Sequence, residues 1–115
     1  DPVPSQIEAA HRAGAQQIEI CTARYAEMTD PTRSSAASLV EDEIGRIMES
    51  ARRATDLGMQ VAAGHGLTYR NVHAIARIDE IEELNIGHNI VARAALVGME
   101  RAVREMIAAI KGRLL

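Results

Sequence analysis

The chain has 115 residues, enough for one domain with a modest core and too few for a second domain. Hydrophobic residues make up 47% and charged residues 25%, which is ordinary for globular proteins and excludes a disordered or fibrous chain. A net charge of -3 and only two aromatic residues exclude the basic patches and stacking platforms of nucleic-acid-binding proteins. Without Phe or Trp, the core must consist of aliphatic residues, as in a parallel sheet covered by helices.

The sequence also indicates the compartment. Cys21 is the single cysteine and cannot form an internal disulfide, which is typical of a reducing environment. No apolar stretch is long enough to span a bilayer, and no basic and apolar leader opens the chain. We therefore expect a soluble, cytoplasmic protein without a membrane partner. The start at Asp1, without an initiator methionine, suggests a processed product or a piece of a longer chain.

The first part of the chain is predicted to form a helix and a strand. Ser5 and Glu8 have the spacing of a helix-capping box, so a helix is expected to start there and to stop at Gly14. Gln17–Cys21 is short and rich in β-branched residues, which predicts a strand. The polar stretch Thr22–Ser35 is expected to be a loop.

The remaining elements alternate in the same way. Apolar residues recur at helical intervals over Ala36–Leu57, and the charged residues between them predict a solvated helix face. Gln60–Ala63 predicts a second strand, followed by a helix that begins near Thr68. A third strand is expected at Glu83–Ile86, and the rest of the chain is predicted to be helical with a pause at Gly98. Strands alternating with helices pair in parallel through right-handed crossovers.

Three parallel strands leave two unpaired sheet edges, whereas a barrel of eight strands has none. Residues 1–115 are therefore predicted to be a single segment of a TIM (β/α)8 barrel. An open, flavodoxin-like sheet is the alternative, although the small residues of Ala62–Gly64 suit a crowded barrel interior at least as well. The unpaired edges predict association with an N-terminal barrel portion or with further copies of the chain.

Two runs, Ala63–Gly66 and Asn85–His88, each place a glycine and a histidine directly after a predicted strand. Ligands bind at the carboxyl ends of parallel strands, where glycine admits a close backbone approach and histidine exchanges protons near neutral pH. His65 is either a general acid or base, or a histidine that fills space at a strand end. Gly87 and His88 either cap the next helix or bind a phosphate through backbone N–H groups.

Glu19 points either into the barrel or toward a helix, and an inward carboxylate is costly unless it is paired or functional. Cys21 is expected on the same face, as a small core residue. Glu19, His65 and His88 are chemically able to ligate a metal. Nothing in the sequence sets their separation, however, and proton transfer suits glycine-flanked histidines equally well. A metal site is therefore not predicted.

The runs Gln17–Ile20, Val61–Val72 and Glu83–Ile90 resemble, in this order, runs of the pyridoxine 5'-phosphate synthase family. The resemblance covers nearly the whole chain and implies the last portion of a TIM barrel, about strands six to eight with their helices. It implies that two phosphorylated substrates, 1-deoxy-D-xylulose 5-phosphate and 3-amino-2-oxopropyl phosphate, condense to form the pyridine ring of vitamin B6 without a cofactor. It also implies an oligomer.

The resemblance implies a role for each residue of the candidate site. His65 would donate a proton, and Glu19 would stabilise the transition state. Gly66, Gly87 and His88 would hold the amino-oxopropyl phosphate, which agrees with the phosphate site expected after the last two barrel strands.

The chain departs from the family in one loop and lacks part of its machinery. Cys21–Ala23 reads Cys-Thr-Ala where the family usually has His-Thr-Gly. The family's other acid and base residues lie on the strands that this chain lacks, so we expect the isolated chain to be inactive. Two alternatives are a phosphate-binding or interaction fragment that associates through its strand edges, and a different barrel enzyme that acts on a phosphorylated substrate.

Overall fold

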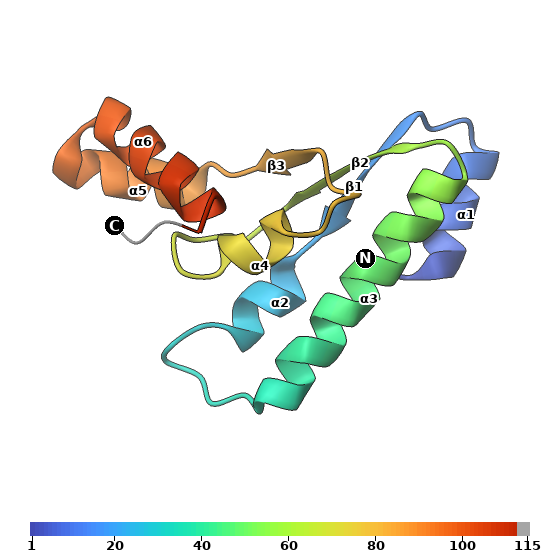
Figure 1. The fold of residues 1–115 in the computed structure, drawn as a ribbon, viewed down its shortest axis with the longest axis horizontal. Coiled ribbons are helices and arrows are strands. Elements are labelled where there is room, and N and C mark those ends of the chain that lie inside the picture. Colours follow the sequence, from blue (N-terminus) through green and yellow to red (C-terminus); the bar gives the residue numbers. More distant parts are fainter. Residues whose placement is uncertain (113–115) are drawn as a thin grey trace.

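A computed structural model describes residues 1–112 of the chain. The elements in chain order are α1 (Pro4–Arg12), β1 (Gln17–Cys21), α2 (Ala23–Met28), α3 (Ala37–Asp56), β2 (Gln60–Gly64), α4 (Val72–Ala76), β3 (Glu83–Asn85), α5 (His88–Val97) and α6 (Met99–Ile110) (Figure 1). The predicted alternation of helices and strands is confirmed, with α2 as an addition.

The three strands form one parallel sheet in the order β1-β2-β3. The β1–β2 pairing runs in register from Gln17 opposite Gln60 to Cys21 opposite Gly64. β3 pairs with the last three residues of β2. All three strands therefore end at the same edge of the sheet. The sheet confirms the α/β class, while the eight-stranded barrel is larger than these three strands and stays a prediction.

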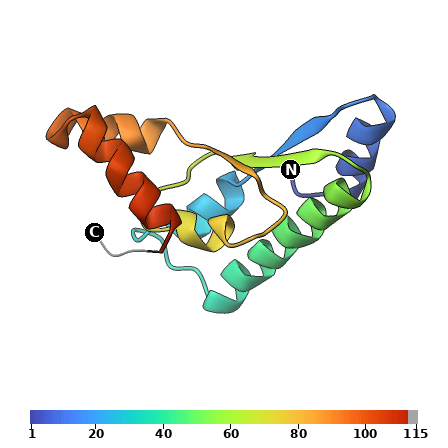
Figure 2. The same cartoon turned by 45° about the horizontal axis from the view of Figure 1, so that its top comes forward.

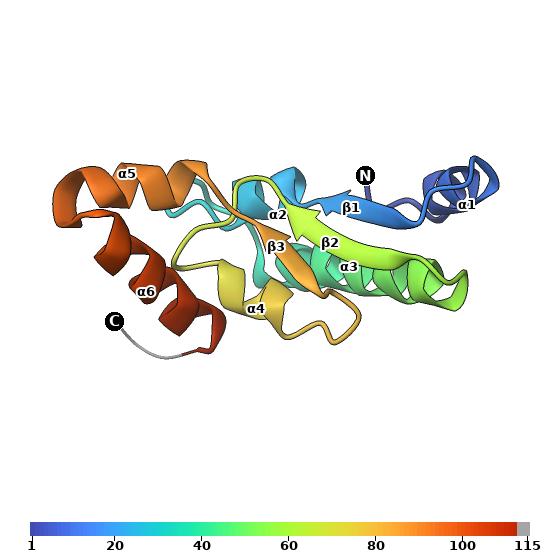
Figure 3. The same cartoon turned by 90° about the horizontal axis from the view of Figure 1, so that it is seen from above.

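Helices cover one face of the sheet. Ile20, Val61 and Ala63 are at most 1% exposed and belong to one hydrophobic cluster with residues of α3 and α4. Burial of an Ile or Val side chain contributes about 1.5–3 kcal/mol, so this layer holds the sheet to its helices. Figures 2 and 3 show the opposite face of the sheet without a covering helix. The exposed strand residues are Gln17, Glu19, Gln60, Glu83 and Asn85.

The capping box predicted at Ser5 and Glu8 is wrong. α1 begins one residue earlier, at Pro4, whose ring presets the backbone angle of a first helical position. No side chain caps this end of α1. Glu8 accepts a hydrogen bond from Nη2 of Arg53 at 2.7 Å and thereby joins α1 to α3.

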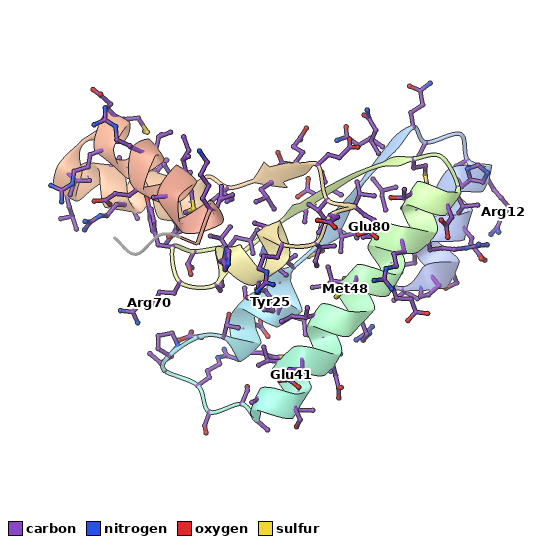
Figure 4. All side chains as sticks on the ribbon, in the orientation of Figure 1. Arg12, Tyr25, Glu41, Met48, Arg70 and Glu80 are labelled. Carbon is purple, nitrogen blue, oxygen red and sulfur yellow. The ribbon has the colours of Figure 1, made fainter. Side chains whose placement is uncertain are left out.

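The loop predicted for Thr22–Ser35 contains the short helix α2. Tyr25 of α2 is 2% exposed, and its hydroxyl donates a hydrogen bond of 2.6 Å to the carbonyl of Asn71. Figure 4 shows Tyr25 where α2 approaches α4. Burial raises the pKa of the Tyr25 phenol still further above neutral pH, and the hydroxyl is a donor. A tertiary contact therefore stabilises a helix too short to form by itself.

Two predictions about single side chains are also wrong. Glu43, predicted on the solvated face of α3, is 3% exposed, and its Oε2 lies 3.2 Å from Nη1 of Arg46 and 3.8 Å from Nε of Arg24. These two guanidinium groups compensate a carboxylate that would otherwise be costly to bury. Cys21, predicted as a core residue, is half-buried and lies outside the hydrophobic cluster.

α5 and α6 form a hairpin beyond the end of β3 (Figure 1). Gly98, with φ of +88°, joins the two helices and produces the predicted pause. Nε of Arg93 on α5 donates to Glu105 on α6 at 2.8 Å. α6 buries Met106 and two alanines, whereas no residue of α5 is buried. Within residues 1–112, none of the helices combines the length and the apolar character that a bilayer crossing requires.

Smaller differences concern the edges of elements. The helix predicted to begin near Thr68 is α4 and starts at Val72, because residues 69–71 form a turn. The third strand ends at Asn85 rather than at Ile86. Both changes lengthen the loops at the carboxyl edge of the sheet.

Candidate functional site

The predicted site residues line a single cleft at the carboxyl edge of the sheet. Its volume is about 620 Å³, within the range of small-molecule sites. The lining comes from β1, from the loop after β2, from the end of β3 and the turn after it, and from the start of α5. The residues are Glu19, His65, Gly66, Leu67, Thr68, Asn85, Ile86, Gly87, His88 and Asn89. Glu19, His65, Gly66, Gly87 and His88 are thus brought together by the parallel topology, while their individual roles stay predictions.

Glu19 lies on the face of the sheet that no helix covers. Its Oε2 accepts a hydrogen bond of 3.1 Å from Nδ2 of Asn85, which fixes the direction of the carboxylate. A Cβ on Gly64, which lies between them on β2, would clash with Oε1 of Glu19 and would lie 2.9 Å from the carbonyl oxygen of Asn85. Glycine at position 64 therefore provides the room that the carboxylate occupies.

His65 is exposed and has a backbone conformation unusual for its type. Its φ is +93°, and among residues 1–112 it is the one non-glycine residue with a positive φ. Such a conformation costs a residue with a Cβ about 1–2 kcal/mol. It persists only where neighbouring groups hold it, and it occurs often at functional sites.

Gly66 continues the same loop and has no room for a side chain. Its φ is +75°, and a Cβ there would lie 2.5 Å from the Cβ of Ala26 on α2. The loop is further held by Asn71, which is 7% exposed. Nδ2 of Asn71 donates to the Gly66 carbonyl at 3.3 Å, and its Oδ1 accepts from the N–H of Thr68 at 2.7 Å. These contacts therefore hold the loop after β2 in one conformation.

The turn after β3 leads directly into α5. Gly87 precedes the first residue of α5, His88, and no side chain caps this helix end. The first N–H groups of a helix have no partner within the helix, and they attract anions. The N–H of Tyr69 donates to Oδ1 of Asn89 at 3.3 Å and joins this turn to the loop after β2. The cleft thus combines a carboxylate, two histidines and a helix N-terminus.

The metal-site alternative receives no geometric support. In the described part of the chain, residues 1–112, no three His, Cys, Asp or Glu side chains lie close enough together to hold a metal ion.

Sequence reasoning missed three residues that organise the cleft, namely Asn71, Asn85 and Thr22. The Thr22 hydroxyl lies 2.8 Å from the carbonyl oxygens of Gly64 and His65. Asn85 and Thr22 each lie at the end of a strand, and this position alone could have marked them as candidates. Asn71 lies at the end of a turn, where nothing in the local sequence distinguishes an amide that binds the loop from a solvated one.

The fold and the cleft define a parallel α/β protein with a cleft of small-molecule size at the carboxyl edge of its sheet. The model of the family described as pyridoxal phosphate biosynthesis protein PdxJ matches residues 1–112. The chain belongs to this family, which confirms the resemblance noted in the sequence.

Similar proteins also bear the name pyridoxine 5'-phosphate synthase. Over 112 residues the chain is 52% identical to the pyridoxine 5'-phosphate synthase of Cyanothece sp. (strain PCC 7425) and 50% identical to that of Nostoc sp. (strain PCC 7120). Each alignment covers 97% of this chain and 44% of the relative. The synthase of Synechococcus sp. (strain JA-2-3B'a(2-13)) is 50% identical over 106 residues, which cover 92% of this chain and 42% of that relative. The chain therefore spans less than half the length of these relatives.

Proposed function

We propose that the chain is the C-terminal part of a pyridoxine 5'-phosphate synthase and contributes one side of its active site. The observation that carries this proposal is the cleft in which Glu19, His65, Gly66, Gly87 and His88 meet. The names of the relatives support the activity. The three parallel strands, with helices on one face only, support an arc of a TIM barrel that comprises about strands six to eight.

In this proposal the acid and charge-stabilising groups stand on neighbouring strand ends. The reaction condenses 1-deoxy-D-xylulose 5-phosphate with 3-amino-2-oxopropyl phosphate and closes the pyridine ring. His65, exposed at the cleft, donates a proton to a departing oxygen. Glu19, held by Asn85, stabilises positive charge that develops in the transition state.

The phosphate of the amino-oxopropyl substrate binds at the start of α5. The N–H groups of its first turn supply donors and the positive end of the helix dipole. Gly66 and Gly87 let the backbone approach the phosphate, and His88 contributes at the same point. A Cβ built on Gly87 meets no atom within 4 Å in residues 1–112, so packing does not explain this glycine. The close approach of a ligand to the backbone explains why this position is a glycine.

The partner in this proposal is the N-terminal portion of the barrel or further copies of this chain. The uncovered face of the sheet carries Glu19, Glu83 and Asn85, as expected of a barrel interior that lines a site. The outer edges of β1 and β3 have no partner strand within residues 1–112, and such edges bind further strands. Without those strands the proton transfers lack their second group, so the chain alone is inactive.

The test is formation of pyridoxine 5'-phosphate from the two substrates by the chain alone and by the chain mixed with the N-terminal fragment of a family member. His65→Ala removes the proposed donor, and His11→Ala, in the exposed part of α1, is the matched control. We expect turnover only in the mixture, lost in His65→Ala and kept in His11→Ala. Turnover that survives His65→Ala contradicts the proposed role.

A second candidate, a phosphate-binding fragment without catalysis, is favoured by one observation. The proposed phosphate contacts, Gly66, Gly87 and His88, all lie within this chain, whereas the chemistry needs groups from elsewhere. Binding of inorganic phosphate by the folded mixture without turnover would favour this candidate.

A further inference from the structure

We propose that Thr22 is a positioning residue that holds His65 in its left-handed backbone conformation and thereby aims the imidazole into the cleft. The inference deepens the proposed function, because it rests on His65 as the proton donor. Thr22 itself does not line the cleft and acts through His65.

Thr22 has a buried hydroxyl group that lies between the ends of β1 and β2. It follows the last residue of β1, and its side chain is 0% exposed. Its Oγ1 lies 2.8 Å from the carbonyl oxygen of Gly64 and 2.8 Å from that of His65. Its own N–H donates to the Gly64 carbonyl, also at 2.8 Å. The hydroxyl group is therefore within hydrogen-bonding distance of two successive carbonyl oxygens in the segment that carries His65.

These two carbonyl groups belong to the peptide units on either side of the His65 Cα. The Gly64 carbonyl lies in the peptide unit that precedes the His65 Cα, and the His65 carbonyl lies in the unit that follows it. Holding both oxygens in one position fixes the relative orientation of the two peptide planes, which is what φ and ψ of His65 describe. The positive φ of His65 is thus tied to one side chain.

Other contacts hold other parts of the loop. Asn71 binds the Gly66 carbonyl and the Thr68 N–H, which follow His65 in the chain. Tyr25 binds the carbonyl of Asn71, still further along. Thr22 is the side chain that reaches the His65 carbonyl itself. Its removal should therefore change His65 while the rest of the loop keeps its anchors.

The test compares Thr22→Val, which keeps the shape and removes the hydroxyl, with Thr22→Ser, which keeps the hydroxyl. The first measurement is by NMR on the isotope-labelled chain, from the backbone and Cβ chemical shifts of His65 and Gly66. We expect both residues to shift and broaden in Thr22→Val, with native shifts in Thr22→Ser and unchanged shifts at Ile20 and Val61 in both. Native shifts of His65 in Thr22→Val overturn the proposal.

A second variant decides the case in which Thr22→Val does not fold. Glycine adopts a positive φ without a steric cost, so His65→Gly removes the need for the hydroxyl. The double variant Thr22→Val with His65→Gly is then expected to fold, which supports the proposal. A double variant that stays unfolded overturns it, because Thr22 would then serve the core rather than His65.

Turnover in the presence of the N-terminal fragment gives the functional readout. We expect kcat of Thr22→Val to fall roughly tenfold with KM unchanged, the loss that corresponds to one buried hydrogen bond, and Thr22→Ser to restore it. If the unmodified mixture shows no turnover, the proposed function fails, while the NMR comparison still decides whether Thr22 holds His65. An unchanged kcat in an otherwise active mixture contradicts the positioning role.

Discussion

The two strand ends that form the cleft are built in opposite ways. After β2, the loop is fixed by Thr22, Tyr25 and Asn71, and Gly66 has no space for a side chain. After β3, Gly87 has an ordinary φ of -126°, and no atom of residues 1–112 lies within 4 Å of a Cβ built on it. Packing alone requires the glycine at position 66, whereas no packing contact within residues 1–112 requires the one at position 87.

This difference separates two reasons for the same residue type. In sequence, Gly66 and Gly87 each stand beside a histidine at a strand end and look equivalent. In the structure, Gly66 belongs to the loop that holds His65 in position, whereas Gly87 directly precedes the first residue of α5. Unfolding experiments on the glycines can test this distinction directly.

The largest effect is expected for Gly66→Ala. The new Cβ meets the Cβ of Ala26 at 2.5 Å in a backbone conformation with positive φ. We expect a loss of about 2–4 kcal/mol in the free energy of unfolding, measured in urea. Gly14→Ala is the matched control, since Gly14 has φ of +91° and a Cβ there meets no atom of residues 1–112 within 4 Å. This variant should lose only about 1–2 kcal/mol. Equal losses at both positions would contradict the packing argument.

Gly64→Ala tests the point where the two strand ends meet. The added Cβ clashes with the Glu19 carboxylate and approaches the backbone of Asn85 to 2.9 Å. Gly64 has no positive φ and the Glu19 side chain can move aside, so only the contact with the Asn85 backbone remains, and we expect a smaller loss of about 1–3 kcal/mol. A chemical-shift change at the Asn85 side-chain amide should accompany it. If that amide keeps its native shift, Gly64 does not make room for the Glu19–Asn85 pair.

A pH titration examines the helices that support the second strand end. Hydrogen bonds from Arg93 and then Arg101 lower the pKa of Glu105 from its usual 4.5 to about 2. A carboxyl whose folded pKa is depressed stabilises the fold above its unfolded pKa, and this contribution is lost as the pH falls from 4.5 toward 2. The thermal midpoint of Glu105→Gln should therefore fall less across this pH range than that of the unmodified chain. Parallel curves would show that the ion pair between α5 and α6 does not couple to stability.

The smallest change in stability is expected for Gly87→Ala. A Cβ at this position meets no atom within 4 Å in residues 1–112, so the free energy of unfolding should stay within about 0.5 kcal/mol. The affinity for inorganic phosphate, followed by NMR titration, should nevertheless fall, because the methyl group intrudes on the ligand's approach. Unchanged phosphate binding would remove the ligand as the reason for this glycine.

The sequence was a good guide where a pattern repeats within one element. The apolar spacing of α3 and the β-branched run of β1 placed both to within a residue, and the glycine and histidine runs located the cleft. What it could not show depends on pairing between distant segments. The Glu19–Asn85 contact follows from the strand register, and α2 depends on a hydrogen bond from Tyr25 to Asn71. Neither relation leaves a trace in local spacing.

The absence of any buried residue in α5 has a consequence for how the molecule opens. Elements with few buried contacts open locally at low cost, whereas core strands open only with global unfolding. Four of the five residues of β2 are buried, so its amide hydrogens should be among the slowest to exchange with solvent deuterium. Those of α5 should exchange early, while the loop that carries His65 is still closed. For the phosphate contact proposed above, this means that the start of α5 would loosen and re-form around the anion while the sheet stays closed.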